Sequence, residues 1–212
     1  MSSATITTSA RLMNSTPQTE EQAMVRKVAV SSFLGNFIEW FDYASYSYFA
    51  TTIALVFFPT DNHTVAMLQT FGVFALSFIL RPIGALFWGS YGDKKGRKAA
   101  LAHSIMFMSG ASFLIGCLPS YSVIGVGAPI LLLLLRMVQG FSASGEYAGA
   151  ATFLGEYAPT SKRGIYCSLI PASTAIGLLA GSTLATLMTA NMNSSAMVGW
   201  GWRVPFLLAG PL

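Results

Sequence analysis

Apolar stretches long enough to cross a membrane occupy most of this sequence. As a helix, about 20 such residues cross the roughly 30 Å hydrocarbon core of a bilayer. The stretches are 28–58, 65–89, 99–118, 127–151 and 164–189, and a sixth, 202–212, begins near the end of the sequence. Backbone that faces lipid must satisfy its own hydrogen bonds, and these stretches lack the alternating pattern of barrel strands. We therefore predict an all-α membrane protein.

The composition favours the same class. Hydrophobic residues make up 53% of the chain and charged residues 9%, whereas soluble domains carry about 25% charged residues. Most of the surface is therefore expected to face lipid, which excludes most soluble enzymes and binding modules. The basic residues form no continuous face that could follow a phosphate backbone, so nucleic acid is not an expected partner. Nucleotide-binding and zinc-ligand spacings are lacking, so we expect neither an enzyme nor a metal or other cofactor.

The connecting segments predict the orientation in the membrane. Segments 59–64, 119–126 and 190–200 contain no lysine or arginine. The N-terminal segment and the other two connectors contain nine, namely Arg11, Arg26, Lys27, Lys94, Lys95, Arg97, Lys98, Lys162 and Arg163. Basic residues are retained on the cytoplasmic side of a membrane. We therefore expect the N-terminus and both basic connectors to be cytoplasmic.

The chain divides into a polar tail and a transmembrane bundle. Residues 1–27 are predicted to form a cytoplasmic tail, of which 1–22 is rich in Ser, Thr, Asn and Gln and is expected to be disordered. Residues 28–212 form the bundle, but its sixth stretch supplies only about half of the length that a bilayer core requires. Either the sequence is a fragment of a longer protein, or its last segment is re-entrant or packs on a partner.

Five ionisable residues interrupt the apolar stretches: Glu39, Asp42, Arg81, Arg136 and Glu146. A charge at the bilayer centre costs about 2.5–3.5 kcal/mol on insertion scales. Such residues therefore normally face a protein interior or a water-filled path, and these five are the first candidates for functional residues.

Glu39, Asp42 and Arg136 are predicted to meet near the middle of the membrane. Glu39 and Asp42 share one helical face, with Glu39 about 16 Å deep, and Arg136 reaches about 14 Å from the opposite side. One interpretation is a buried ion pair that only holds helices together. The other is a proton relay, in which a carboxyl exchanges its proton for an arginine contact. We favour the relay and assign proton coupling to Glu39 and Asp42.

The other charges within the stretches have different expected roles. Arg81 lies about 12 Å from the cytoplasmic end of its stretch, where it either binds an anionic solute or extends toward the lipid headgroups. Arg136 is the second candidate for solute binding. Glu146 lies beyond Arg136 toward the cytoplasm, which favours a place in an inner gate.

The residues of the connector at 89–98 indicate more than a solvated basic loop. Its glycines permit a tight turn between closely packed helices, and Asp93 can accept hydrogen bonds at a helix end or pair with a basic neighbour. This connector closely resembles the signature between the second and third spans of the major facilitator superfamily. Segment 136–142 resembles that superfamily's fourth-span motif, and segment 156–164 resembles the connector after it.

The superfamily resemblance implies twelve spans in two six-helix halves, with the solute held between them. It implies that this chain is the N-terminal six-helix bundle of a major facilitator fold, with its sixth helix incomplete. It also implies that Asp93, Arg97, Glu156 and Arg163 form a cytoplasmic charge network that locks the outward-facing state.

Segments 35–43, 81–85 and 139–147 further resemble the metabolite:proton symporter family, although Ser144 stands where glycine is usual. Members of that family carry solutes such as proline, betaine, 2-oxoglutarate, citrate and shikimate. The resemblance implies a proton-coupled symporter for small organic acids or zwitterions in a bacterial inner membrane. Its expected partners are the solute, the lipid bilayer and a missing C-terminal half, and the proton is the coupling ion.

Two alternatives remain open. One is a half-size subunit that functions only with another half, and the other is a truncated, non-transporting membrane remnant or interaction protein. A coding sequence that continues past Leu212 for six or more spans favours the fragment, whereas an immediate stop favours the alternatives.

Overall fold

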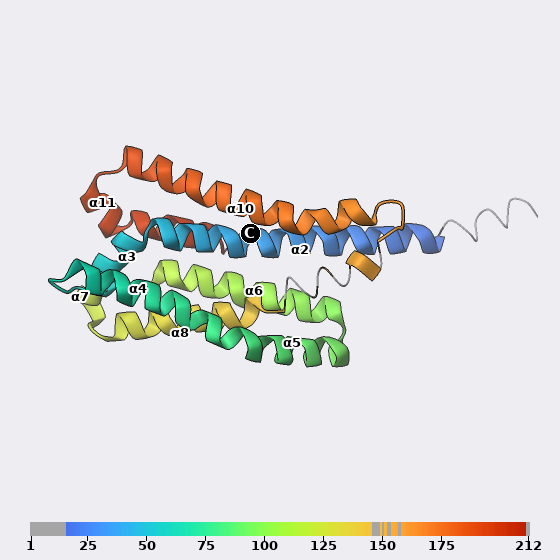
Figure 1. The fold of residues 1–212 in the computed structure, drawn as a ribbon, viewed down its shortest axis with the longest axis horizontal. Helices are drawn as coiled ribbons and strands as arrows, with labels where there is room; N and C mark the ends of the chain where they lie inside the picture. Colours follow the sequence, from blue (N-terminus) through green and yellow to red (C-terminus); the bar gives the residue numbers. More distant parts are fainter. Residues whose placement is uncertain (1–15, 146–148, 150, 152–153, 157, 211–212) are drawn as a thin grey trace, which may run out of the picture.

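The structure is a computed structural model that describes residues 16–145, 149, 151, 154–156 and 158–210. Within these residues it contains helices and no strands, which confirms the predicted all-α class (Figure 1). The helices are α2 (Thr16–Tyr48), α3 (Ala50–Phe57), α4 (His63–Ser77), the 3₁₀ helix η1 (Phe78–Leu80), α5 (Arg81–Lys95), α6 (Arg97–Cys117), α7 (Tyr121–Ile124), α8 (Gly127–Ala143), α10 (Arg163–Asn191), α11 (Ser194–Gly199), the 3₁₀ helix η2 (Gly201–Arg203) and α12 (Val204–Leu208).

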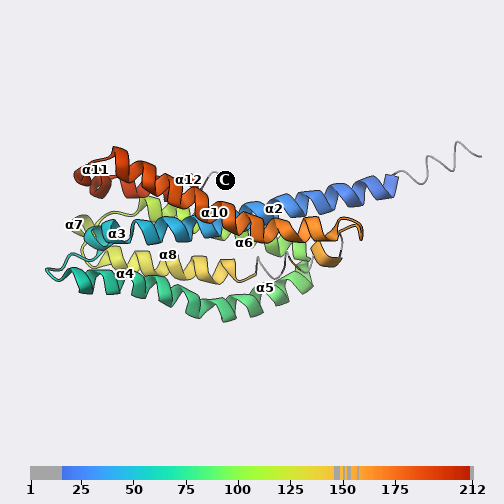
Figure 2. The same ribbon diagram turned by 45° about the horizontal axis from the view of Figure 1, so that its top comes forward.

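The long helices lie side by side along one axis, so that the bundle has two ends (Figure 1). The start of α2, the turn between α5 and α6, and the start of α10 lie at one end, and α3, α7 and α11 lie at the other in both views (Figures 1 and 2). We call the first the basic end, because Lys94, Lys95, Arg97, Lys98, Lys162 and Arg163 are found there. The basic connectors that the sequence predicts on one side of the membrane therefore lie together.

Large apolar side chains cover much of the outer surface of the bundle. Leu68 is 68% exposed, Leu86 78% and Leu179 66%, which is typical of helices that face lipid or other helices rather than water. By length and composition, three of the described helical segments could cross a membrane: His63–Lys95, Arg97–Cys117 and Arg163–Asn191. α8 is apolar but shorter, and α2 is long but carries polar residues such as Glu39 and Asp42 along its length.

The first helix starts within the predicted tail. The expectation of disorder up to residue 22 is wrong from Thr16 onward, because α2 begins there. Val25 is only 1% exposed and packs with Ala29, Leu154 and Ile170 at the basic end. This cluster gives the start of α2 an apolar packing partner. The sequence does not indicate it, because Val25 is followed directly by Arg26 and Lys27.

Glycines allow two pairs of helices to approach closely. A Cβ at Gly177 of α10 would lie 2.7 Å from the Phe37 carbonyl oxygen, and one at Gly181 would lie 2.6 Å from Ala44 Cβ, so α10 rests directly on the backbone of α2. On the other side of the bundle, a Cβ at Gly140 of α8 would overlap the Ser77 carbonyl oxygen at the end of α4. Both contacts leave no room for a larger side chain.

A short 3₁₀ turn bends the segment that corresponds to the second apolar stretch. α4 and α5 form one curved path with η1 between them (Figure 2). Pro82 stands in the first turn of α5, where its missing N–H is tolerated, and its ring disfavours a continuous α-helix through the preceding turn. The bend places Arg81 at the start of α5, close to α2.

Candidate functional site

A fully buried ion pair joins α2 to α8. Arg136 Nη1 donates to Asp42 Oδ2 at 2.5 Å, and both side chains are 1% exposed. The other carboxylate oxygen of Asp42 accepts hydrogen bonds from Gln139 Nε2 at 3.1 Å and from Ser112 Oγ at 3.2 Å. Gln139 Nε2 also lies 2.6 Å from Ser112 Oγ, which ties α6 into the same network. Three side chains therefore donate to the Asp42 carboxylate and fix its orientation.

Aromatic rings surround the Arg136 guanidinium. Its Cζ lies 3.8 Å from the centroid of the Tyr46 ring, with Phe74 and Phe206 at 5.8 and 5.7 Å. The Tyr46 hydroxyl donates to the Thr70 carbonyl oxygen at 2.8 Å, which fixes that ring. Cation–π contact of this kind offsets part of the cost of burying the arginine.

A second, more open pair forms one helical turn earlier on α2. Glu39 Oε1 accepts hydrogen bonds from Arg81 Nη2 and, at 3.0 Å, from the Tyr43 hydroxyl. Arg81 Nη2 also contacts the Tyr43 hydroxyl oxygen, so the three side chains form one cluster. The Glu39 side chain is 4% exposed but that of Arg81 is 30% exposed. The cluster therefore reaches the surface on the arginine side.

The predicted meeting of Glu39, Asp42 and Arg136 is only partly correct. Asp42 contacts Arg136, but Glu39 pairs with Arg81 instead. Residues three apart on a helix point about 60° away from each other, which is enough to direct one toward α5 and the other toward α8. Arg81 is the counter-ion of Glu39, a contact that neither of its two expected roles included.

Two adjoining grooves on the bundle surface meet at this cluster. One has a volume of about 720 Å³ and is lined by Trp40, Tyr43, Phe78 and Arg81, among others. The second, of about 550 Å³, shares Trp40, Phe78 and Arg81 and adds Glu39. Both volumes fall in the range of small-molecule sites, which span about 300–1,000 Å³. Arg136, the other expected solute ligand, lines neither groove.

The expected gate residues lie at the basic end. Arg97 Nη1 lies 3.6 Å from Glu156 Oε2, and their side chains are 47% and 56% exposed. Asp93 and Arg163 are also exposed, and of this set only Arg97 and Glu156 form an ion pair within the described part of the chain. Glu146 lies outside the described residues.

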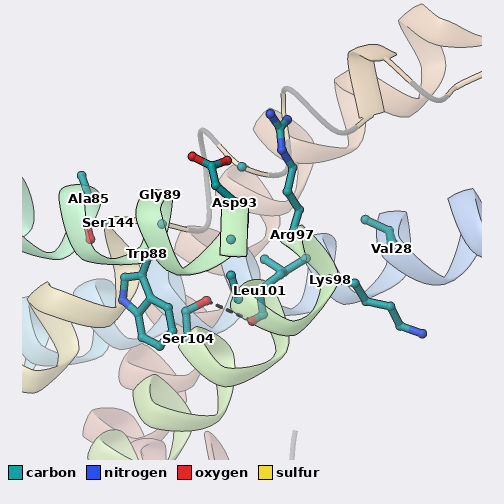
Figure 3. A pocket seen from close by; sticks show the side chains of 14 residues that line it. Val28, Ala85, Trp88, Gly89, Asp93, Arg97, Lys98, Leu101, Ser104 and Ser144 are labelled. Atoms are coloured by element: carbon teal, nitrogen blue, oxygen red, sulfur yellow. Dashed lines mark hydrogen bonds between the residues drawn. The ribbon is translucent and has the colours of Figure 1, made fainter. Parts of the chain in front are cut away.

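A cavity of about 250 Å³ opens beside these charges. Its wall combines Trp88 and small residues such as Gly145 with the charged side chains of Asp93, Arg97 and Lys98. Figure 3 shows Asp93 and Arg97 on the same side of the cavity, whereas Lys98 points away from them. The Trp88 indole N–H donates to the Phe141 carbonyl oxygen at 3.1 Å, which holds α5 against α8 beside the cavity.

Sequence reasoning assigned no role to four polar partners in the site. Tyr43 stands four residues after Glu39, and Gln139 three residues after Arg136, so helical spacing alone could have identified both. Asn36, which accepts from the Trp40 indole, stands three residues before Glu39, so the same spacing could have identified it. Ser112 comes from α6, and no local pattern links it to the charges.

Comparison with known proteins identifies the family. A family model described as "Sugar (and other) transporter" matches residues 27–212. The chain belongs to this family. Members of the sugar (and other) transporter family are transporters rather than enzymes, and the family lies in the major facilitator superfamily, which confirms the resemblance that the motifs indicate. Together with the apolar helices, this membership identifies a multi-pass membrane protein.

Curated proteins that are similar to this chain are named as transporters of proline, betaine and related compounds. The chain is 42% identical over 192 residues to the proline/betaine transporter of Salmonella typhimurium, and 42% identical over 192 residues to the glycine betaine/proline/ectoine/pipecolic acid transporter OusA of Dickeya dadantii. A putative proline/betaine transporter of Staphylococcus aureus is 42% identical over 184 residues. The matches cover 86–91% of this chain but 38–40% of those proteins, so the chain spans about two fifths of their length.

Solved structures share the fold. The proton:xylose symporter XylE bound to 6-bromo-6-deoxy-D-glucose superposes with a TM-score of 0.74 at 17% identity, over 90% of this chain and 43% of XylE. The inward-open conformation of XylE from E. coli gives a TM-score of 0.69 at 17% identity, over 88% of this chain and 45% of XylE. The described helices therefore adopt the major facilitator fold.

Proposed function

We propose that this chain is the N-terminal half of a proton-coupled symporter for small carboxylate-bearing solutes, either zwitterions or organic acids. The observation that carries the proposal is the Glu39–Arg81 pair, which combines a nearly buried carboxylate with an arginine that faces a groove. The names of the curated relatives support zwitterions such as proline and betaine, and the proton symport named for XylE supports proton coupling.

The first coupling step takes place at Arg81. Its Nε makes no hydrogen bond to the described residues, and its Nη2 is shared between Glu39 and Tyr43, so a solute carboxylate competes with Glu39 for the guanidinium. A carboxylate that loses its counter-ion in a nearly buried position takes up a proton, because burial disfavours its charged form. Solute binding at Arg81 thereby favours protonation of Glu39.

The second step involves Asp42 and Arg136. The pair is sealed, so Arg136 can reach a solute only when its contact with Asp42 opens. A proton on Asp42 removes the negative charge that holds Arg136 and makes this opening less costly. In this proposal Glu39 and Asp42 are the proton-coupling residues, and Arg81 and Arg136 bind the solute in turn.

The gate belongs to the basic end. We assign Asp93, Arg97, Glu146, Glu156 and Arg163 to a charge network that closes the cytoplasmic side, and the Arg97–Glu156 contact supports this assignment. The concentration of basic connectors at this end supports a cytoplasmic N-terminus in a bacterial inner membrane. A second six-helix half completes the solute path, because the grooves lie on the surface of this bundle.

Proton-driven uptake into proteoliposomes tests the proposal. The chain is reconstituted alone and with a co-expressed C-terminal half, and labelled proline or glycine betaine is offered with and without an imposed inward proton gradient. We expect gradient-driven accumulation only when both halves are present. Accumulation by the chain alone would contradict the need for a second half, and no uptake of any carboxylate-bearing solute by the complete assembly would favour the remnant or interaction protein.

Two neutral variants test the coupling residues. Glu39→Gln and Asp42→Asn should each remove acceleration by the proton gradient, because neither amide can take up the proton. The matched control is Asp61→Asn, which changes an exposed carboxylate in the connector before α4 and should leave the gradient response intact. If both site variants keep a normal response, the proton relay is wrong.

A further inference from the structure

Aromatic side chains line the larger groove beside Arg81. Trp40, Tyr43, Tyr48, Phe74 and Phe78 contribute to its wall. The Trp40 and Tyr43 rings are 5.8 Å apart in an edge-to-face arrangement, and the Arg81 Cζ lies 5.5 Å from the same Tyr43 ring. An aromatic face and a cationic group therefore both lie beside Tyr43 and line the same two grooves, so one small solute can touch both.

Arg81 already occupies part of this aromatic wall. Its Cζ lies 4.6 Å from the centroid of Phe78 as well as 5.5 Å from that of Tyr43. No such cation contact involves Trp40 within the described residues. The indole, which has the most strongly attracting face of the aromatic side chains, is therefore available to a cation from the solute.

A chain of hydrogen bonds fixes the Trp40 indole. Its Nε1 donates to Asn36 Oδ1 at 3.2 Å. The Nδ2 of Asn36, a residue that is 2% exposed, donates to the Ile170 carbonyl oxygen at 3.0 Å and to Ser173 Oγ and Thr174 Oγ1 at 2.8 Å each. Asn36 thus connects the ring to α10, so the indole is oriented before any solute binds.

The charges around the groove determine what kind of cation fits. Glu39 is the carboxylate among the described lining residues of the two grooves, and it is engaged by Arg81 and Tyr43. A primary ammonium would need acceptors for its N–H groups, whereas a fully methylated ammonium has no N–H to satisfy and is recognised by aromatic faces.

We propose that Trp40 is the ammonium subsite of the solute site, that Asn36 is its positioning residue, and that the pair selects zwitterions with an N-methylated ammonium over those with a primary one. This inference rests on the proposed function, since it assumes that Arg81 takes the solute carboxylate. The Trp40 indole then receives the other end of the same molecule.

A methylation series tests the selection. In proteoliposomes that contain the complete transporter, uptake of labelled glycine betaine is inhibited with glycine, N-methylglycine, N,N-dimethylglycine and unlabelled glycine betaine. We expect inhibition to strengthen with each methyl group. Trp40→Leu should weaken inhibition by glycine betaine about tenfold while changing inhibition by glycine little, which flattens the series. Trp200→Leu is the matched control, because this exposed tryptophan follows α11 at the end of the bundle opposite the basic end. This variant should keep the full increase of inhibition with methylation.

Asn36 is tested by a double-mutant cycle. Asn36→Ala should reduce the methylation preference when Trp40 is present, and should have no further effect on it in a Trp40→Phe background, because phenylalanine has no indole N–H to anchor. Should Trp40→Leu fail to fold, the order of preference across Trp40→Tyr and Trp40→Phe decides, since both keep an aromatic face and should keep a reduced series.

The outcomes separate this inference from the proposed function. Uptake that responds to the proton gradient but shows no preference for methylated solutes, or a preference that survives Trp40→Leu, overturns the ammonium subsite alone. Absence of uptake of every carboxylate-bearing solute overturns the proposed function itself.

Discussion

Two carboxylates three positions apart on α2 lie in very different surroundings. Asp42 is 1% exposed and accepts from three side chains, whereas Glu39 pairs with an arginine that reaches a groove. Sequence alone predicts how far along its helix each charge lies, because the rise per residue of a helix is fixed. It predicted Arg136 near Asp42 but not the pairing of Glu39 with Arg81, because partners depend on how each helix is rotated about its axis, and apolar stretches carry little periodic signal.

The buried pair gives a prediction about stability. Asp42→Asn should strongly lower the unfolding temperature in detergent, because removal of one partner from a buried pair costs about 3–5 kcal/mol and leaves Arg136 without a counter-charge. The double variant Asp42→Asn with Arg136→Leu should lose less than the sum of the two single variants. Thermal unfolding monitored by fluorescence measures all three, and simple additivity of the losses would contradict this account of the pair.

At the scale of the helices, the sequence predicted where the helical segments lie better than where a segment is interrupted. The stretch 99–118 corresponds closely to α6, and 164–189 to α10. The stretch 28–58 instead contains the junction between α2 and α3, and 65–89 contains η1. Apolar composition reports where a chain can enter lipid, but it does not distinguish α from 3₁₀ geometry. Pro82 was the one local signal of the second break.

The contact between α4 and α8 gives a prediction at this scale. Gly140→Ala should lower the unfolding temperature, because the new methyl group would overlap the Ser77 carbonyl oxygen and force the two helices apart. Gly72→Ala is the matched control in α4, since nothing lies within 4 Å of its Cβ position. That change should be neutral or slightly stabilising, by up to about 1 kcal/mol, because alanine favours a helix. Equal effects of the two substitutions in thermal unfolding would rule out this contact as the cause.

For the whole molecule, the distribution of charged residues predicted which connectors share one end of the bundle, whereas hydrophobicity did not predict which helices are neighbours. The distribution of lysine and arginine predicts that both basic connectors share one side, and they lie at one end of the bundle (Figure 1). Which helices are neighbours could not be predicted in the same way. Surfaces that face lipid and surfaces that face another helix are both apolar, so the packing of α2 on α10 or of α6 on α8 leaves no distinct pattern of hydrophobicity.

The orientation in the membrane can be measured directly with single cysteines. In a background of Cys117→Ser and Cys167→Ser, Asp61→Cys should react in intact cells with a maleimide that does not cross membranes. Lys95→Cys should react only after permeabilisation, because Lys95 lies at the basic end and is expected in the cytoplasm. Labelling of Lys95→Cys in intact cells would reverse the assigned orientation.

A variant of the Arg97–Glu156 pair tests whether this contact is a gate or only stabilises the fold. Because both side chains are about half exposed, Glu156→Gln should shift the unfolding temperature very little. If the pair closes the cytoplasmic side, the same variant should change the rate of solute exchange in proteoliposomes. Lys162→Gln, at an exposed neighbouring charge, is the control and should change neither quantity. A large loss of stability without a change in exchange would make the pair structural.

The fit of Gly140 against the Ser77 carbonyl oxygen, directly before the 3₁₀ turn, also limits how this bundle can move. Sliding or straightening of α4 would break that contact. Sliding of α2 along α10 would replace Gly177 and Gly181 at the contact with larger side chains, for which there is no room. Helix pairs fitted this tightly do not shear past each other. Any large change of access to the grooves should therefore occur as a rigid rotation of the whole bundle against its surroundings, and the contacts of Glu39 and Asp42 with their arginines should change through side-chain movement rather than helix movement.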